Sequence, residues 1–485
     1  MSEIKNNDAF VDSPEDGAQR RLEQLGYKQE LDRRLSVTGN VVMGLSNVAP
    51  VMAAFLYGMA AFTVAGTGAI GAGWMQGITV CLIGLILAEA GSIYPVSGGL
   101  YSLVKYMLPR PLAFVAVFTF MIQAVIYPPA IAMGLGQYVQ ELFPALPQTA
   151  FATSMIAAIS LIFSLLIGLN NIVTSNRVAK FFLALQLVVI FVFLYICFAN
   201  PVRPLTEVLF DPVMLSGEEG VGLTSVSFMG VLLGLGIMCA AIDGYPASLG
   251  FSEETKGSCR NVGKAALITA LCTVFLVVIC MTMGAIAAPD ISEFLGRADQ
   301  NSSPYLYIAQ SYMGQMGADV INIGIIIASF SCQTMVITYM SRVIYTGARD
   351  RIWPEPMNKF LGQVSKKQTP WACTLVVGLL CSIMVFSNTM VDLVTYGGMS
   401  AAIVYLLVVI GSINSRRKDP GITRPFRMPL FPLPPVLVTL FLCVAIGSQE
   451  TSNQLVVGSF VAFALLYYFL YIRPRDKREE KHNDG

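Results

Sequence analysis

Two short interruptions in an apolar sequence decide the fold of this chain: GLSNVAP at residues 44–50 and AAIDGYP at residues 240–246. Each combines glycine, proline and a polar side chain in the middle of a run that is long enough to cross a membrane. Proline removes a backbone N–H donor and clashes with the preceding helical turn, so a helix should break or kink at each stretch. The sequence therefore predicts two discontinuous helices.

The sequence around these interruptions is strongly apolar. Of the 485 residues, 55% are hydrophobic and 13% are charged. A helix needs roughly 20 apolar residues to cross the hydrocarbon layer, and continuous rather than alternating apolarity favours helices over a closed barrel. We predict an all-α integral membrane protein with twelve transmembrane helices. They are expected near residues 36–63, 70–95, 111–140, 150–169, 177–199, 223–250, 262–288, 316–346, 370–387, 390–412, 430–448 and 454–472.

The basic residues predict how the helices are oriented, because Lys and Arg are retained on the cytoplasmic side. With twelve spans and the N-terminus inside, the outer loops contain only Arg203 and Arg297. The polar residues 1–35 lack an apolar h-region, so we interpret them as a cytoplasmic segment and not as a signal peptide. We expect both ends of the chain in the cytoplasm and the protein in the plasma membrane, the inner membrane of a bacterium. The tail, 473–485, is then cytoplasmic.

The two interruptions occupy the first and sixth predicted helices, five helices apart. This spacing is typical of inverted-repeat transporters, in which the binding site lies between discontinuous helices. Residues 36–412 would form a transport core of ten helices, and residues 413–472 would add two accessory helices. Glycine and proline also serve close packing in membrane helices, which is the alternative explanation for any single one of them. Two matched clusters favour discontinuity.

Few ionisable residues lie inside the predicted spans, and each needs a reason because burying a charge there is costly. Asp243 lies in the second interruption, where it could pair with a substrate ammonium group, take up a proton, or cap the second half of the broken helix. Glu89, near the inner end of the second span, is interpreted mainly as a structural contact and is a second candidate for proton coupling. Asp392 begins the tenth span.

Several classes of function are not supported by the sequence. The single histidine is His482 in the tail, and neither a Walker-type phosphate loop nor paired carboxylates on one helix face of a span occur, so we predict no enzyme and no ATP-driven pump. The ten cysteines form no C-x-x-C pair. We expect no disulfide framework, metal ion, cofactor or nucleic-acid partner.

Stretches in two regions of the sequence resemble a known family, the amino acid–polyamine–organocation transporters. DGY at residues 243–245, followed by SEETK at 252–256 and RNV at 260–262, is similar to the family's sixth-helix signature. AEAGSIYPVSGGLY at residues 88–101 is similar to the stretch after its second helix. The resemblance implies a five-plus-five inverted-repeat fold of the LeuT type and alternating access. It also implies that the substrate pocket is lined by Gly44, Leu45, Ser46, Asn47, Ala240, Ala241, Ile242 and Asp243.

The first interruption departs from the family pattern. The common G-[SA]-G-I motif, whose backbone holds the substrate carboxylate, is replaced by GLSN at residues 44–47. With Pro50 and Gly58, this pattern looks more like carriers of putrescine, amines and 4-aminobutyrate. A fifth-helix lysine that some proton-coupled members use aligns with Gln186, so that coupling device is not expected here.

The main hypothesis is a secondary transporter for an amino acid, polyamine or other amine, working by proton-coupled symport or by exchange. A second hypothesis is a transporter-like membrane sensor that binds the same solutes without substantial flux. A channel is a third, although no repeated filter sequence occurs.

Overall fold

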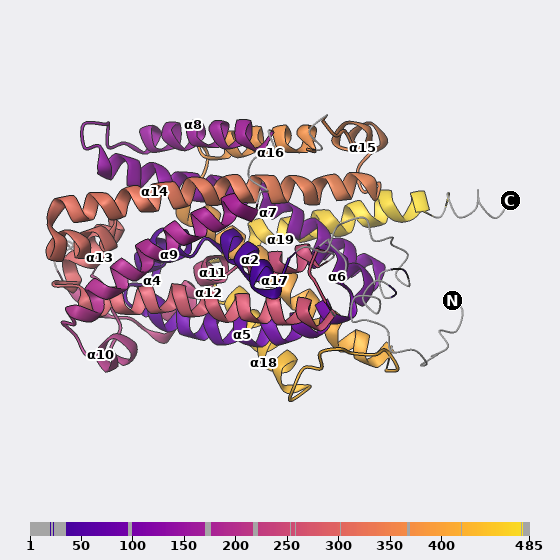
Figure 1. Ribbon diagram of the computed structural model, residues 1–485, viewed down its shortest axis with the longest axis horizontal. Coiled ribbons are helices and arrows are strands. Elements are labelled where there is room, and N and C mark those ends of the chain that lie inside the picture. The colour runs from indigo at the N-terminus through magenta and orange to yellow at the C-terminus, as the bar shows by residue number, and fades with distance from the viewer. Residues whose placement is uncertain are drawn as a thin grey trace.

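The computed structural model describes residues 20, 23, 35–95, 99–169, 176–216, 222–252, 254–257, 259–300, 302–365, 369–418, 420–476 and 478. Most of the predicted N-terminal segment and of the tail from residue 477 lies outside the described residues. The helices run mainly along the long axis of one bundle, with α10 and α13 at one end and α6 and α15 at the other (Figure 1). We refer to these as the α13 end and the α6 end.

Within the described residues the fold is all-α, as predicted, apart from a hairpin of two short strands that was not predicted. The first half of the described chain contains α2 (Val37–Val48), α3 (Pro50–Met52), η1 (Ala53–Tyr57), α4 (Gly58–Ala65), α5 (Gly68–Ile93), α6 (Leu100–Met107), α7 (Arg110–Leu142), α8 (Ala150–Gly168), α9 (Asn176–Ala199), α10 (Leu205–Phe210), β1 (Val213–Leu215) and β2 (Leu223–Ser225). The second half contains α11 (Phe228–Ala241), η3 (Tyr245–Phe251), α12 (Cys259–Ala287), α13 (Ile291–Asp299), α14 (Pro304–Arg349), α15 (Glu355–Leu361), α16 (Trp371–Met384), α17 (Met390–Lys418), α18 (Leu433–Gly447), α19 (Thr451–Tyr467) and η4 (Tyr468–Ile472).

Ten stretches within the described residues are long and apolar enough to cross a membrane. The two other predicted spans, 370–387 and 430–448, correspond to the apolar helices α16 and α18, which have 14 and 15 residues. The count of twelve spans therefore stays a prediction.

One predicted boundary was wrong. The sixth span was expected from residue 223, but residues 223–225 form β2, which pairs antiparallel with β1, and α11 begins only at Phe228. The eighth span, expected at 316–346, corresponds to the part of α14 that follows Gly314, whose φ of 71° interrupts the helical path. Before this kink lies a shorter helical segment that begins at Pro304, where Ser303 caps the first turn, and that no predicted span covered.

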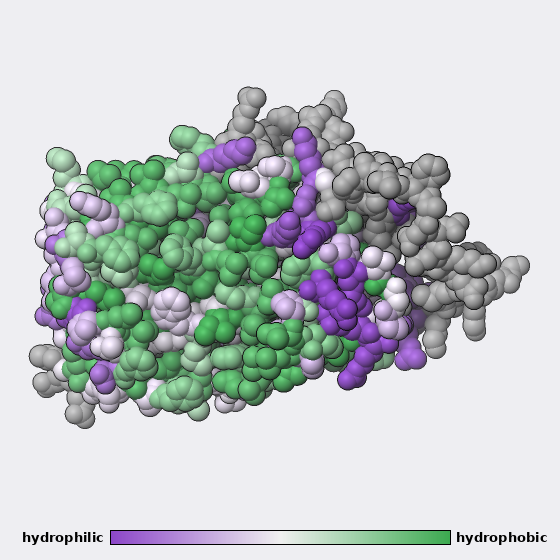
Figure 2. Space-filling view, turned by 60° about the horizontal axis from the view of Figure 1, so that its bottom comes forward, coloured by the Kyte–Doolittle hydropathy of each residue, from purple (hydrophilic) through white to green (hydrophobic). Residues whose placement is uncertain are grey.

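The surface matches a membrane-embedded bundle. Apolar residues cover the middle of the face in Figure 2, and hydrophilic residues gather toward the α6 end. Large apolar side chains such as Met316 and Leu470 are 81% and 75% exposed, which suits contact with lipid and not with water. The two basic residues predicted for outer loops, Arg203 and Arg297, lie beside α10 and in α13, whereas Lys105 lies in α6 at the opposite end.

Both predicted helix breaks are confirmed. In the first helix, α2 ends at Val48 because Ala49 adopts a left-handed conformation (φ 50°), and Pro50 then starts α3. In the sixth, α11 ends at Ala241, and Gly244 (φ 90°) precedes the 3-10 helix η3. A left-handed residue ends a helix by turning the chain out of its axis, so each span consists of two offset segments.

Close packing positions these breaks. α5 packs along α12, and α7 packs along both α14 and α17. α11 approaches α17 so closely that a Cβ atom at Gly398 would overlap the carbonyl oxygen of Gly236. Small residues permit such contacts in membrane proteins, where dispersion between helices replaces the hydrophobic driving force.

Glu89 joins α5 to α17 and to the segment after α17. Its carboxylate accepts hydrogen bonds from Arg416 Nε at 2.8 Å, from Arg424 Nη1 at 3.0 Å and from the backbone N–H of Met428 at 2.7 Å, and Arg416 Nη2 is a further donor. This geometry agrees with the structural interpretation of Glu89. Its role in proton coupling stays a prediction.

Candidate functional site

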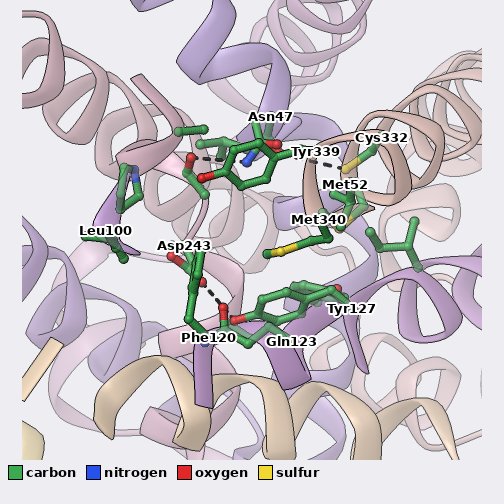
Figure 3. Close-up of a pocket in the computed structure, with 18 residues that line it drawn as sticks. Asn47, Met52, Leu100, Phe120, Gln123, Tyr127, Asp243, Cys332, Tyr339 and Met340 are labelled. Atoms are coloured by element: carbon green, nitrogen blue, oxygen red, sulfur yellow. Dashed lines mark hydrogen bonds between the residues drawn. The ribbon is translucent and has the colours of Figure 1, made fainter. Parts of the chain in front are cut away.

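The two breaks meet at a cavity in the middle of the bundle. Residues from α2, α7, α11 and α14, together with the segments between α2 and α4 and between α11 and η3, line it (Figure 3). Its volume is about 50 Å³. That volume holds a few water-sized groups.

Asp243 provides the negative charge of this cavity. Tyr127 Oη, from α7, donates a hydrogen bond to Asp243 Oδ2 at 2.8 Å, and Tyr405 Oη, from α17, donates one to Oδ1. The backbone N–H of Gly244 is a third donor. Figure 3 shows the Asp243 and Tyr127 side chains directed toward one another at one side of the cavity. Three donors thus hold the carboxylate in place while it still faces the cavity.

The first and second breaks are in direct contact. Asn47 Nδ2, in the last turn of α2, donates a hydrogen bond to the carbonyl oxygen of Gly244 at 3.2 Å. A Cβ atom at Gly244 would lie 3.1 Å from Asn47 Nδ2 and 3.2 Å from Val48 Cα, and the positive φ already disfavours any other residue. Glycine is therefore required here for both the backbone turn and the close approach of the two helices.

One buried hydroxyl group in the cavity wall has no partner among the described residues. Tyr57, on η1, is 2% exposed, and its Oη forms no hydrogen bond there. A buried polar group that is left unpaired costs free energy. Because Tyr57 lines the cavity, a solute or water that occupies the cavity would supply the missing partner.

Most of the remaining wall is apolar. It includes Met52, Phe120, Ile131, Val336 and Met340. A polar amide of Gln123 and the thiol of Cys332 add to it, and Cys332 Sγ lies 3.9 Å from the carbonyl oxygen of Asn47. Among the described lining residues, Asp243 is the one with an ionisable carboxylate, and none is Lys, Arg or His.

The structure brings together only part of the predicted site. Asn47, Ala240 and Asp243 line the cavity. Ala241 and Ile242 do not line it, because both side chains are buried in the apolar core. Their positions follow the helical path of α11, which directs neighbouring residues to different sides.

Of the predicted site residues in α2, only Asn47 lines the cavity. Gly44 packs against α12 and η3, where an added Cβ would lie 2.8 Å from Thr269 Cγ2, so this glycine serves close packing. Leu45 is buried among residues of α9 and α12. Ser46 Oγ donates to the carbonyl oxygen of Val42 at 2.8 Å. None of these three, nor Glu89, is among the residues that line the cavity.

Sequence reasoning missed the aromatic partners of Asp243. The predicted site residues included none of Tyr57, Tyr127 and Tyr405. These tyrosines lie in otherwise apolar helices. The sequence therefore indicates their role only by having tyrosine at positions where phenylalanine would pack equally well. Which carboxylate each would meet depends on how α7 and α17 pack.

A second cavity of about 270 Å³ adjoins the first. It shares Asn47, Ala247 and Tyr339 with the central cavity, and its wall also contains Glu254 and Arg342. Arg342 lies near the C-terminal end of α14, so this cavity extends toward the α6 end. A larger cavity of about 730 Å³ at the opposite side contains Glu141 and Asp392, and it shares no described lining residue with the central one.

Comparisons with known proteins agree with this architecture. The family model described as "Amino acid permease" matches residues 35–471. The chain is 24% identical to the branched-chain amino acid permease BcaP of Bacillus subtilis, over 87% of this chain and 91% of that protein. It is 24% identical to a methylthioribose transporter of the same organism, over 92% and 94%, and 25% identical to the human large neutral amino acids transporter small subunit 2, over 82% and 72%. Because the match covers nearly the whole membrane-embedded region, the chain belongs to the amino acid permease family of membrane transporters.

Proposed function

We propose that this transporter is a secondary active carrier for a small solute that bears a protonated amine. The observation that carries the proposal is the single carboxylate of Asp243 facing a small, largely apolar cavity whose described lining contains no basic side chain. A charge in such surroundings is costly unless a counter-charge or a proton joins it. An ammonium group or a proton would satisfy this need.

The broken helices would supply the rest of the recognition. Segment ends expose backbone N–H groups that stabilise anions and carbonyl groups that stabilise cations. A substrate carboxylate, if present, would be held by such N–H groups near Asn47, while the ammonium group would approach Asp243. This arrangement accommodates an amino acid, including 4-aminobutyrate, as well as an amine without a carboxylate, such as a polyamine.

The apolar wall of the cavity narrows the class of solute further. Met52, Phe120 and Ile131 suit an aliphatic or thioether side chain more than a second charged group. Relatives are named for branched-chain amino acids, for large neutral amino acids and for methylthioribose. An amine-bearing solute with a compact apolar part fits both the wall and the carboxylate.

Movement of the solute would follow alternating access. Residues 36–412 would form two inverted repeats around the cavity, and the transition would open the cavity alternately toward each end of the bundle. The cavity that adjoins Tyr339 would be the route to the cytoplasm, with both chain ends on that side of a bacterial inner membrane. Coupling to protons at Asp243, or exchange of two solutes, would drive net transport.

Uptake into proteoliposomes tests the proposal. Leucine, methionine, putrescine and 4-aminobutyrate should be compared, with and without an imposed pH gradient. Stimulation of one of them by an inward proton gradient supports symport, and stimulation by solute loaded inside supports exchange. If purified protein binds one of these solutes but moves none, the sensor hypothesis is favoured and the proposal fails.

A thiol in the cavity offers an independent measurement of where the solute binds. Cys332 lines the cavity, whereas Cys443 is exposed on α18. A transported solute should slow the reaction of Cys332 with N-ethylmaleimide, followed by mass spectrometry, and should leave Cys443 unchanged. Equal rates at Cys332 with and without solute would place the binding site elsewhere.

A further inference from the structure

A separate cavity lies at the α6 end, on the outside of the transport core. It has a volume of about 240 Å³ and lies between α6, the first turns of α7, the end of α14 and η4. Three basic side chains line it: Lys105, Arg110 and Arg475. Lys105 and Arg110 are neighbours in the sequence, but Arg475 comes from the C-terminal end of the described chain, so the fold brings the third basic side chain to the other two.

Among the described residues that line this cavity, three are basic and one, Asp350, is acidic. Lys105 Nζ lies 3.3 Å from Asp350 Oδ2. Arg110 and Arg475 both contact the carboxylate of Asp476, which lies 3.0 Å from Arg475. The side chains of Lys105 and Arg110 are 45% and 62% exposed, so both can also reach an anion that enters the cavity.

The opposite wall of the same cavity is apolar. It contains Phe114, Val117, Tyr468 and Ile472. Nearby on the same helices, Leu112 and Leu470 expose large apolar side chains to the surroundings. The cavity thus combines basic and apolar side chains at the α6 end of the bundle, the end toward which hydrophilic residues gather in Figure 2. In a membrane, this is the depth of the lipid headgroups.

The combination points to one kind of ligand. Arginine donates paired hydrogen bonds that match a phosphate group, and basic pockets between membrane helices bind anionic headgroups. A free phosphate would make no use of the apolar wall, whereas a hydrocarbon chain alone would make no use of the three cations. We propose that this cavity binds an anionic phospholipid, with Lys105, Arg110 and Arg475 around its phosphate and its acyl chain beside Phe114 and Ile472.

Such a lipid would add a link between elements that already contact each other at this end, for example where Phe114 packs on Tyr468 and Tyr467 donates a hydrogen bond to the carbonyl oxygen of Ile352. Its phosphate would bridge α6, the start of α7 and the end of the last membrane helix. This role is independent of the central cavity, so it does not rest on which solute the protein carries.

Native mass spectrometry of the full-length protein in detergent tests the proposal. The protein is titrated with phosphatidylglycerol, with phosphatidylcholine of the same acyl chains, and with inorganic phosphate. We expect phosphatidylglycerol to bind at least tenfold more tightly than phosphatidylcholine, and the double variant Lys105→Gln/Arg110→Gln to lose about tenfold in its affinity. Arg297→Gln, in α13 at the other end, is the matched control and should bind as the wild type does.

Three results would overturn the proposal. Equal binding of the two lipids would show that the apolar wall alone is recognised. Binding of inorganic phosphate as tight as that of phosphatidylglycerol would show a free-anion site. Unchanged phosphatidylglycerol binding in the double variant would place the lipid elsewhere. If the double variant unfolds, Lys105→Gln alone, which alters a half-exposed ion pair, should still weaken lipid binding severalfold, and Arg110→Lys should retain it.

Discussion

Replacement of Asp243 by Asn is the most direct test of the central cavity. The change removes the charge and keeps the size of the side chain. Asn can still accept a hydrogen bond through Oδ1 and can donate one through Nδ2 to a tyrosine hydroxyl. Tyr127 Oη also lies 3.2 Å from the carbonyl oxygen of Gly397, which can accept a hydrogen bond from the Tyr127 hydroxyl when the carboxylate is gone. The local fold should therefore survive, with a stability loss of about 1 kcal/mol.

The effect on transport should be larger than the effect on stability. A hydrogen bond to a charged group contributes about 1.5–3 kcal/mol, and each 1.4 kcal/mol corresponds to about a tenfold change. Loss of the ammonium–carboxylate contact should thus lower kcat/KM for uptake about 10- to 100-fold. The assay is initial uptake into proteoliposomes containing equal amounts of protein, together with the midpoint of thermal unfolding.

The matched control is Asp319→Asn. Asp319 lies on α14 and accepts a hydrogen bond from Gln315, away from the cavity, so the same chemical change there should leave kcat/KM within about twofold. If Asp243→Asn transports the solute with unchanged kcat/KM, the carboxylate does not contact the amine. Its role is then limited to capping the start of η3, and the recognition scheme is wrong.

Three further changes test the scaffold around the cavity. Glu89→Gln should lower the free energy of unfolding by about 3–5 kcal/mol, because Arg416 and Arg424 lose their charge partner. Glu293→Gln, in an exposed ion pair, should lower it by less than about 1 kcal/mol. A thermal unfolding experiment in which Glu293→Gln is the more destabilised variant would contradict this. Gly398→Ala should lower the yield of folded protein in size-exclusion chromatography, because its Cβ would overlap α11, while Gly421→Ala, with open space around it, should not. Asn47→Ala should slow uptake severalfold at little cost in stability; a normal rate would show that the link between the two breaks is dispensable.

The sequence was informative where a residue type has a purely local consequence. Pro50 and Gly244 each lie in a cluster of glycine, proline and polar residues within an apolar span, and such a cluster disfavours a continuous helix, so both breaks could be predicted without knowledge of the packing. A proline alone would not have been sufficient, because Pro128 and Pro129 lie inside the continuous helix α7. The apolar runs likewise predicted an all-α membrane protein. Asp243 was identified as a site candidate because a carboxylate in a span is unusual whatever its neighbours are.

The remainder of the site depends on how helices pack, which local sequence does not encode. Gly44 and Ile242 neighbour the breaks but face other helices, because only one side of each segment is directed to the cavity. Tyr405 lies 162 positions from Asp243 in the sequence and meets it only because α17 packs against α11.

The two tyrosines that hold Asp243 restrict how the bundle can move. They come from α7 and α17, whereas the carboxylate belongs to the broken sixth helix, which Asn47 links to the broken first helix. When the two broken helices move away from α7 and α17, the hydrogen bonds from Tyr127 and Tyr405 to Asp243 must both break, at a cost of about 1.5–3 kcal/mol each. An arriving ammonium group can replace these donors on the carboxylate, and the cost then falls. The cavity would thus open toward the other side of the membrane more readily when it is loaded than when it is empty.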